Sequence, residues 1–260
     1  MMADTLVVTS ALNPVTDAPK VSVVEPQVRL SQLCCSLLSW AKESAIQKVV
    51  LCDNSSPEYD FRYFQQIFED SNKSFEVLSF QGDRSKVAAK GKGYGEGEIM
   101  RYALEHSQLL VQSQSFYKVT GRVYISNFSR LHQMHRRQRR VFDNPIPALR
   151  RYAKRYAISL QDDSRHKIGR VNTVFYKCNK QFFLDRLLTR NDLVNDRDRF
   201  TLEHAYFEPL IRYGFSTFET RPSIVGVSGT TGRFYQAGED YPTAIKLRAA
   251  ALADKLTSQV

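Results

Sequence analysis

The sequence predicts an α/β protein in which a mainly parallel central sheet, related to the Rossmann type, is flanked by helices and carries a basic amphipathic insertion. Two observations predict this class. Short apolar strands alternate with amphipathic helices through the first half of the chain, which is typical of a parallel sheet with crossover helices. The 260 residues also include 42% hydrophobic side chains, enough to bury a substantial core.

Each element is indicated by its own pattern. The expected strands are apolar runs of five or six residues with polar ends, and the expected helices repeat leucine, alanine or aromatic residues at helical spacing. The segment 242–256 predicts a terminal helix that packs on the core. The strands are expected at 6–10, 48–52, 75–80 and 115–119, and the other helices at 29–44, 61–69 and 96–108.

Composition excludes several classes of protein. No run approaches the roughly 18 to 20 apolar residues of a membrane span, and the N-terminus lacks the pattern of a secretory signal. Cys34, Cys35, Cys52 and Cys178 show no Cys-x-x-Cys spacing, so we expect buried thiols in a reducing compartment. We therefore expect a cytoplasmic location, with the inner face of the membrane as an alternative working site.

The net charge of +10 is concentrated between residues 130 and 170, where few acidic residues occur. Such a block predicts an anionic partner, either a membrane surface or a nucleic acid, although a solvated insertion is the plainer alternative. Apolar residues interleave with the charges, and this amphipathic mixing favours the membrane over nucleic acid. The basic residues are Arg136, Arg137, Arg139, Arg140, Arg150, Arg151, Lys154, Arg155, Arg165 and Lys167, and the apolar ones are Leu131, Met134, Val141, Phe142, Ile146, Leu149, Tyr152 and Tyr156.

All four expected strands end in polar residues. In open parallel sheets, ligands bind beyond the carboxyl ends of the strands, so these ends predict a binding site. Thr9 and Ser10 are expected to contact a base, and Asp53 a ribose or base. Asn54 is also a candidate, although the segment 53–57 equally suits a turn and a helix cap. The remaining ends are at 81–82 and 120–122.

The segment 90–98 reads Lys-Gly-Lys-Gly-Tyr-Gly-Glu-Gly-Glu. Glycines at alternate positions allow backbone amides to approach a bulky anion, and the positive end of the expected helix points back at them. Lys90 and Lys92 add positive charge, so the segment predicts a phosphate-bearing ligand. A flexible turn that only starts the helix is the alternative.

Together, the first strand with Val8-Thr9-Ser10, the second ending in Leu51-Cys-Asp-Asn-Ser55 and the glycine segment resemble nucleotide-sugar-dependent glycosyltransferases of the GT-A type. The resemblance covers roughly residues 6–123 and continues more loosely to about residue 235. It implies a nucleotide-sugar donor near Lys90, Gly91, Lys92 and Gly93.

The fourth strand departs from that family. Most members end it with Asp-x-Asp, whose carboxylates hold a divalent metal, whereas this strand continues as Thr120-Gly121-Arg122 after Lys118. Lys118 and Arg122 could neutralise a departing diphosphate in place of the metal. We therefore expect donor binding without a metal or other cofactor. The alternative is that both side chains are structural.

The chain contains a single literal Asp-x-Asp, at 196–198, but no apolar strand precedes it, so a loop is expected there. The resemblance implies a late carboxylate that deprotonates the acceptor hydroxyl. Glu203 is the candidate for this role and Asp198 the reserve, although a carboxylate in a first helical turn can also stabilise its own helix. His204 is expected to be a packing or hydrogen-bonding residue.

A final motif at 222–233 breaks from an apolar run into glycines, hydroxyl residues and an arginine. It predicts a second anion-binding loop through Ser228 and Arg233, or alternatively a plain surface hairpin. The expected donor-binding set is Thr9, Ser10, Asp53, Asn54, Lys90, Gly91, Lys92, Gly93, Lys118, Thr120, Gly121, Arg122, Ser228 and Arg233.

The function expected from these observations is transfer of a sugar from a nucleotide donor to a hydroxyl of a glycan or lipid-linked acceptor, as in the synthesis of cell-surface polysaccharide or lipopolysaccharide. The expected organisation is a donor-binding half at 1–125, the basic insertion at 126–170, and an acceptor and catalytic half at 171–260. Two alternatives remain. One is a sugar-phosphate nucleotidyltransferase, although the glycine-rich loop usual after its first strand is missing, and the other is a non-catalytic nucleic-acid-binding protein.

Overall fold

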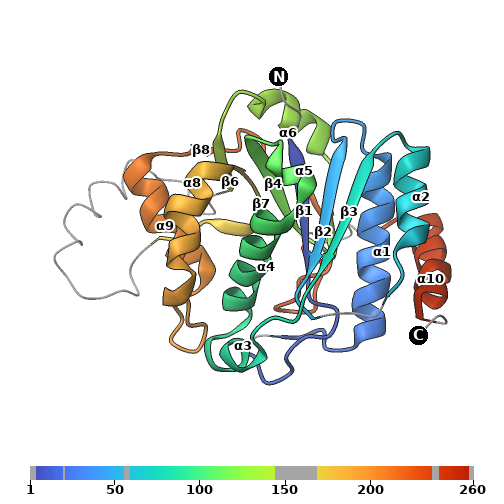
Figure 1. Cartoon of the computed structure of the whole chain (residues 1–260), viewed down its shortest axis with the longest axis horizontal. Coiled ribbons are helices and arrows are strands. Elements are labelled where there is room, and N and C mark those ends of the chain that lie inside the picture. Colours follow the sequence, from blue (N-terminus) through green and yellow to red (C-terminus); the bar gives the residue numbers. More distant parts are fainter. Residues whose placement is uncertain (1–3, 20, 56–58, 144–168, 236–239, 258–260) are drawn as a thin grey trace.

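A computed structural model describes residues 4–19, 21–55, 59–143, 169–235 and 240–257 (Figure 1). The central sheet has seven strands in the order β3-β2-β1-β4-β7-β6-β8. β1 pairs in parallel with β2 and β4, and β2 with β3, whereas β7 runs antiparallel to β4 and β6. The predicted mainly parallel sheet is confirmed. The strands are β1 (Thr5–Ser10), β2 (Lys48–Asp53), β3 (Ser74–Ser79), β4 (Ser115–Thr120), β6 (Arg140–Asp143), β7 (Asn172–Asn179) and β8 (Ser216–Thr217).

Helices cover both faces of the sheet, which is why the successive β1 residues from Thr5 to Thr9 are all buried. Leu6 and Val8 face one core cluster, which includes side chains of α1 and α10, while Val7 faces the other, which includes α4 and α9. The helical segments are α1 (Pro26–Lys42), α2 (Arg62–Asp70), α3 (Arg84–Lys90), α4 (Lys92–His106), α5 (Gln108–Val111), α6 (Phe128–His135), α8 (Lys180–Phe182), η2 (Phe183–Leu187), η3 (Leu188–Leu193), α9 (Leu202–Tyr213) and α10 (Thr243–Thr257). No helix in these described ranges is both long and apolar enough to cross a membrane.

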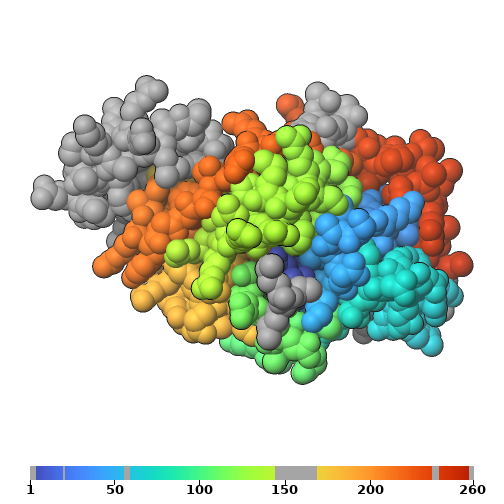
Figure 2. Space-filling model, turned by 90° about the horizontal axis from the view of Figure 1, so that it is seen from above, coloured from blue at the N-terminus to red at the C-terminus, as the bar shows by residue number. Residues whose placement is uncertain are grey.

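The expected basic insertion at 126–170 is partly built into the core. The helix α6 lies across the end of the molecule where β1 and β4 begin, as Figure 2 shows in yellow-green, and β6 is a strand of the main sheet. Leu131, Val141 and Phe142 are 0% exposed. These three apolar residues therefore pack inside the protein and are not presented to a membrane. Ile146, Leu149, Tyr152 and Tyr156 lie outside the described residues.

A second, two-stranded sheet connects distant parts of the chain. β5 (Val123–Ile125) pairs antiparallel with β9 (Ile224–Gly226), so the residues that follow β4 lie beside the segment 222–235. Gly226 has φ 118°, a conformation that favours glycine, and a Cβ there would lie 2.5 Å from the carbonyl oxygen of Arg122. This close contact places the late loop over the end of the central sheet.

Candidate functional site

One cavity lies at the carboxyl ends of β1, β2 and β4. Its lining includes Thr9 and Ser10 after β1, Asn54 and Ser55 after β2, and the segment 120–122 after β4. Gly82, which follows β3, also lines the cavity. Strand order reverses between β1 and β4, and such a switch point leaves an open crevice in α/β sheets.

Gly121 brings the ends of β1 and β4 into close contact. Its backbone N–H donates to the carbonyl oxygen of Thr9 at 2.8 Å, and a Cβ on Gly121 would lie 2.9 Å from that same oxygen. A side chain would therefore force the two strand ends apart. This tight junction fixes where the next residue, Arg122, enters the cavity.

The guanidinium group of Arg122 is largely enclosed. Its Nη1 atom is buried and has no hydrogen-bond partner among the described residues. Burial lowers the pKa of Arg122 below its ordinary value. A buried donor without an acceptor is costly and uncommon in folded proteins, so this atom is poised to receive an acceptor from a ligand.

Two further cations surround Arg122. Arg29 from α1 donates to the carbonyl oxygens of Val23 and Ala11, each at 2.6 Å, and burial together with the charge of Arg122 lowers its pKa to about 9. Lys92 at the start of α4 lines the same cavity, and burial lowers its pKa too. Arg122 lies close enough to the other two cations for its charge to lower both of their pKa values further, so this end of the cavity is suited to a polyanion.

The loop that follows β9 closes one side of the cavity. Its residues Gly229, Thr230 and Tyr235 are part of the lining, and Lys92 donates to the hydroxyl of Thr230. Ser22 secures the loop from the other side by bonding to the carbonyl oxygens of Gly229, at 3.1 Å, and Thr230, at 2.5 Å. The loop is therefore held directly against the cationic end.

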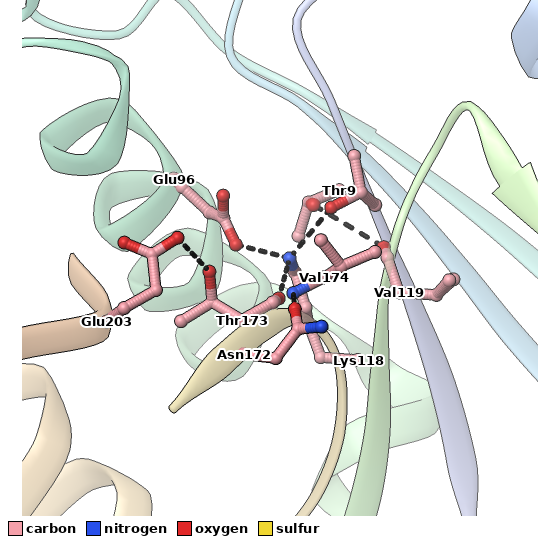
Figure 3. Close-up of polar contacts among 9 residues, drawn as sticks. Thr9, Glu96, Lys118, Val119, Asn172, Thr173, Val174 and Glu203 are labelled. Carbon is pink, nitrogen blue, oxygen red and sulfur yellow. Dashed lines mark hydrogen bonds and ion pairs between the residues drawn. The ribbon is translucent and has the colours of Figure 1, made fainter. Parts of the chain in front are cut away.

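Two carboxylates also line the cavity. Glu96 from α4 forms an ion pair with Lys118, and Glu203 from α9 accepts a hydrogen bond from the hydroxyl of Thr173 at 3.2 Å (Figure 3). Lys118 itself is 0% exposed and does not belong to the lining. Of the two cations expected at the fourth strand, only Arg122 can contact a ligand in the cavity.

The glycine segment differs from the expected anion loop. The helix α4 begins at Lys92, so Gly93, Gly95 and Gly97 lie within it. Their missing side chains make room for neighbouring groups, because a Cβ on Gly97 would lie 1.8 Å from the Oδ1 atom of Asn191. Gly91 directly follows the last residue of α3 and has φ 106°. Its Cα packs so closely against the side chain of Asp196 that a Cβ atom would not fit. Of these glycines only Gly95 lines the cavity, so the glycines serve close packing, whereas Lys92 of the same segment contributes a cation to the lining.

Several predicted site residues lie outside the cavity lining. Asp53 is 2% exposed, and its carboxylate accepts hydrogen bonds from the backbone of Leu12 and from Ser55, so it shapes the turn after β2. Lys90 donates to the carbonyl oxygen of Asp192 at 2.7 Å. Asp198 accepts from Asn195 at 2.7 Å.

The remaining members of the predicted set also have local partners. The backbone N–H of Ser228 donates to the carbonyl oxygen of Arg233 at 2.8 Å, which is the hairpin expected as the alternative for this loop, and neither residue belongs to the lining. His204 forms a capping box with Thr201 at the start of α9, as expected for a hydrogen-bonding histidine. Gly93 donates its N–H to Asp196 at 3.0 Å.

Sequence reasoning missed Arg29, Glu96 and Thr173. Arg29 had a visible signal, because it is the single arginine of its helix and stands directly before the apolar pattern that begins at Leu30. Glu96 is part of the glycine segment, where the positive charge of Lys90 and Lys92 indicated an anion-binding role and drew no attention to an acidic residue. Thr173 had no signal, since it reaches the cavity only through the antiparallel pairing of β7 with β4.

The chemistry of the lining bears on how a diphosphate could be bound. Among the described residues, no group of three or more His, Cys, Asp or Glu side chains lies close enough to hold a metal ion. Arg122 directly follows Gly121 in the turn after β4. The site therefore presents fixed cations toward the switch point between β1 and β4.

No family model matches the chain, and no curated protein matches it. Among solved structures, the galactosyltransferase LgtC in complex with donor and acceptor sugar analogs is similar at 7% identity, with 97% of this chain and 96% of that chain covered and a TM-score of 0.48. An active-site mutant of LgtC has 8% identity, 82% and 72% coverage and a TM-score of 0.48. A putative glucose-1-phosphate thymidylyltransferase from Bacillus anthracis has 12% identity, 97% and 95% coverage and a TM-score of 0.43.

Proposed function

We propose that this protein is a GT-A-type glycosyltransferase that transfers a sugar from a nucleotide donor to a hydroxyl acceptor. One observation supports the proposal above the others: the buried Nη1 atom of Arg122, at the switch point of the sheet, has no hydrogen-bond partner among the described residues and has Arg29 and Lys92 beside it. Two phosphate groups supply the acceptors and the negative charge that this arrangement lacks among the described residues.

The roles follow from position. Thr9, Ser10 and Asn54 contact the nucleoside, while Arg122, Arg29 and Lys92 bind the diphosphate. As the bond between the anomeric carbon and the diphosphate oxygen breaks, the leaving nucleoside diphosphate keeps the electron pair, and the cations stabilise the charge that develops. This arrangement supplies the countercharge without a metal.

Glu203 is proposed as the general base. It takes the proton from the acceptor hydroxyl, whose oxygen forms a new bond to the anomeric carbon. The side chain lines the cavity and accepts one hydrogen bond, from Thr173, which holds it in place. A single displacement of this kind inverts the configuration of the anomeric carbon.

We also propose that the acceptor is a glycan or lipid-linked hydroxyl and that the protein associates with an anionic membrane surface. Arg130, Arg136, Arg137 and Arg139 remain exposed beside α6 and β6, at the end of the sheet away from the cavity, so their charges are accessible to such a surface but do not themselves contact the acceptor. The four cysteines are free and buried, which suits a reducing, cytoplasmic compartment.

A panel of nucleotide sugars and nucleoside diphosphates tests the proposal, with and without a chelator. Binding to the folded state raises the melting temperature by mass action. We expect one nucleotide class to stabilise the protein equally with and without chelator, and its sugar to be released or transferred as free nucleoside diphosphate accumulates. Stabilisation only by nucleoside triphosphates, with release of pyrophosphate, would instead identify a nucleotidyltransferase. Stabilisation by RNA or DNA alone would contradict the proposal.

A further inference from the structure

The cavity lining carries both signs of charge close together. The carboxylates Glu96 and Glu203, from α4 and α9, lie near enough to Lys92 for their charges to raise its pKa against the lowering effect of burial, and Glu96 acts on Arg122 in the same way. A ligand bound to these cations therefore has acidic side chains beside it.

Glu96 is held in a single orientation by Lys118. An ammonium group has three N–H donors, and those of Lys118 are directed to Glu96 Oε1, to Thr120 Oγ1 at 3.1 Å and to the carbonyl oxygen of Thr173 at 2.7 Å. Lys118 has no donor left for a ligand. Its role is to fix Glu96 in place.

The second carboxylate oxygen of Glu96 is open to a ligand. It points away from Lys118 in Figure 3 and receives no hydrogen bond from the described residues, while the side chain is 25% exposed and lines the cavity. As the anionic member of an ion pair, Glu96 offers acceptor oxygens only. A group that donates a hydrogen bond is its natural partner.

Thr173 links the two carboxylates. Its carbonyl oxygen accepts from Lys118, and its hydroxyl donates to Glu203 (Figure 3). β7 therefore places Glu96 and Glu203 around one part of the cavity. A glycosyl group attached to a diphosphate on Arg122 would lie next to both acidic side chains.

We propose that Glu96 selects the glycosyl group of the donor, binding the hydroxyl on the sixth carbon of a neutral hexose and rejecting a hexuronate, which carries a carboxylate at that carbon. This inference rests on the proposed function. A hexose hydroxyl donates to the open oxygen of Glu96. A uronate carboxylate has no proton to donate, so two anionic oxygens would meet without a hydrogen between them.

Matched donor pairs test this selection. UDP-glucose with UDP-glucuronate, UDP-galactose with UDP-galacturonate, and GDP-mannose with GDP-mannuronate differ only at the sixth carbon, where a carboxylate replaces a hydroxymethyl group. Calorimetric titration of each pair, together with UDP and GDP, gives the ratio of affinities. We expect the neutral member of the pair that binds to be favoured by about tenfold or more.

Glu96→Gln is the informative variant, because it removes the charge and keeps an acceptor oxygen for Lys118. The ratio between neutral and uronate donors should fall toward one, while the affinity for the nucleoside diphosphate alone should not fall, because a negative charge near Lys92 and Arg122 has been removed. Glu105→Gln is the matched control, since Glu105 is exposed on the same helix and loses the same charge. If Glu96→Gln fails to fold, the double variant Glu96→Gln/Lys118→Met removes both charges of the buried pair.

The outcomes separate this inference from the proposed function. An equal or higher affinity for the uronate in the wild type, or an unchanged ratio in the Glu96 variant, would overturn the role of Glu96 while leaving the diphosphate site intact. Binding of UDP or GDP without binding of any sugar donor would also overturn it. Failure of every nucleotide to bind would overturn the proposed function itself.

Discussion

Gly229 lies directly against the guanidinium group of Arg122. A Cβ atom placed on Gly229 would come within 1.8 Å of Arg122 Nη2 and 2.6 Å of its central carbon. The obstructing atoms form the far end of a flexible side chain, so a larger residue at 229 would displace the guanidinium and leave the backbone in place. The loop after β9 thus helps to position the cation that is central to the site.

Gly229→Ala should weaken diphosphate binding with little loss of stability. We expect an affinity about tenfold lower, because the displaced Arg122 loses a charged hydrogen bond to the ligand. Thr231→Ala on the same exposed loop is the control and should bind as the wild type does. Titration calorimetry and thermal unfolding measure the two effects. Normal binding by Gly229→Ala would mean that Arg122 does not contact the ligand.

The ion pair between Glu96 and Lys118 should be strongly coupled. Glu96→Ala leaves a fully buried ammonium without its partner, which should lower the free energy of unfolding by about 3 kcal/mol. The double variant Glu96→Ala/Lys118→Met should recover much of that loss. Urea unfolding of the four proteins in the cycle measures the coupling, and additive effects would show that the pair is not formed.

Gly91→Ala tests whether the glycine segment packs or binds. Its φ of 106° and the approach of its Cβ position to within 2.4 Å of Asp196 should cost about 2 to 3 kcal/mol of stability. The fraction that remains folded should bind nucleoside diphosphate with normal affinity. The contrary result, lost affinity at normal stability, would restore a direct anion-binding role to this segment.

Binding should weaken at alkaline pH through Lys92. Burial, followed by the nearby charge of Arg122, lowers the pKa of Lys92 below its ordinary value of 10.5, although Glu96, Glu203 and Asp196 oppose this shift. A diphosphate prefers the protonated lysine, so affinity is constant below the lowered pKa and falls as pH rises through it.

The stability of the ligand-free protein should show the opposite trend. Between the lowered pKa of Lys92 and 10.5 the unfolded chain binds more protons, so the contribution of Lys92 to stability rises with pH. Lys92→Arg should keep its affinity to higher pH, because arginine stays charged. Affinities measured from about pH 7 to 10 test this, and identical profiles for the two proteins would remove Lys92 from the site.

Glu203→Gln should lower turnover by about 100-fold or more while leaving donor affinity within about twofold, as expected when a general base is lost. Glu105→Gln again provides the exposed control. A larger loss of turnover in Asp198→Asn than in Glu203→Gln would move the base to the loop before α9.

The first four strands of the sheet could be predicted because each is a short, mainly apolar segment with a polar end. The residues at the carboxyl ends of β1, β2 and β4 meet at one cavity, as expected for parallel neighbours in a sheet. The start of α4 was harder to predict from the sequence. Glycine is a poor helix former, so nothing local indicates that Gly93 and Gly95 are helical, and only the contacts with Asp196 and Asn54 show why these positions lack side chains.

The partners of charged residues were the least predictable. Lys118 looks in sequence like a ligand-binding cation, yet its strand is central and both faces are covered, so it is buried and requires Glu96. Arg122 lies just beyond the end of the same strand, where the chain leaves the sheet, and its Nη1 atom has no partner among the described residues. The difference between a structural cation and a binding one therefore depends on tertiary burial, which the local sequence does not reveal.

The central claim is that Arg122 binds the diphosphate of the donor, and titration of wild type and Arg122→Gln with UDP and GDP in the presence of a chelator tests it most directly. Loss of a charged hydrogen bond predicts an affinity lower by about 10- to 100-fold, with a melting temperature of the ligand-free protein that does not fall, because a buried donor without a partner among the described residues has been removed. Equal affinities for the two proteins would contradict the claim.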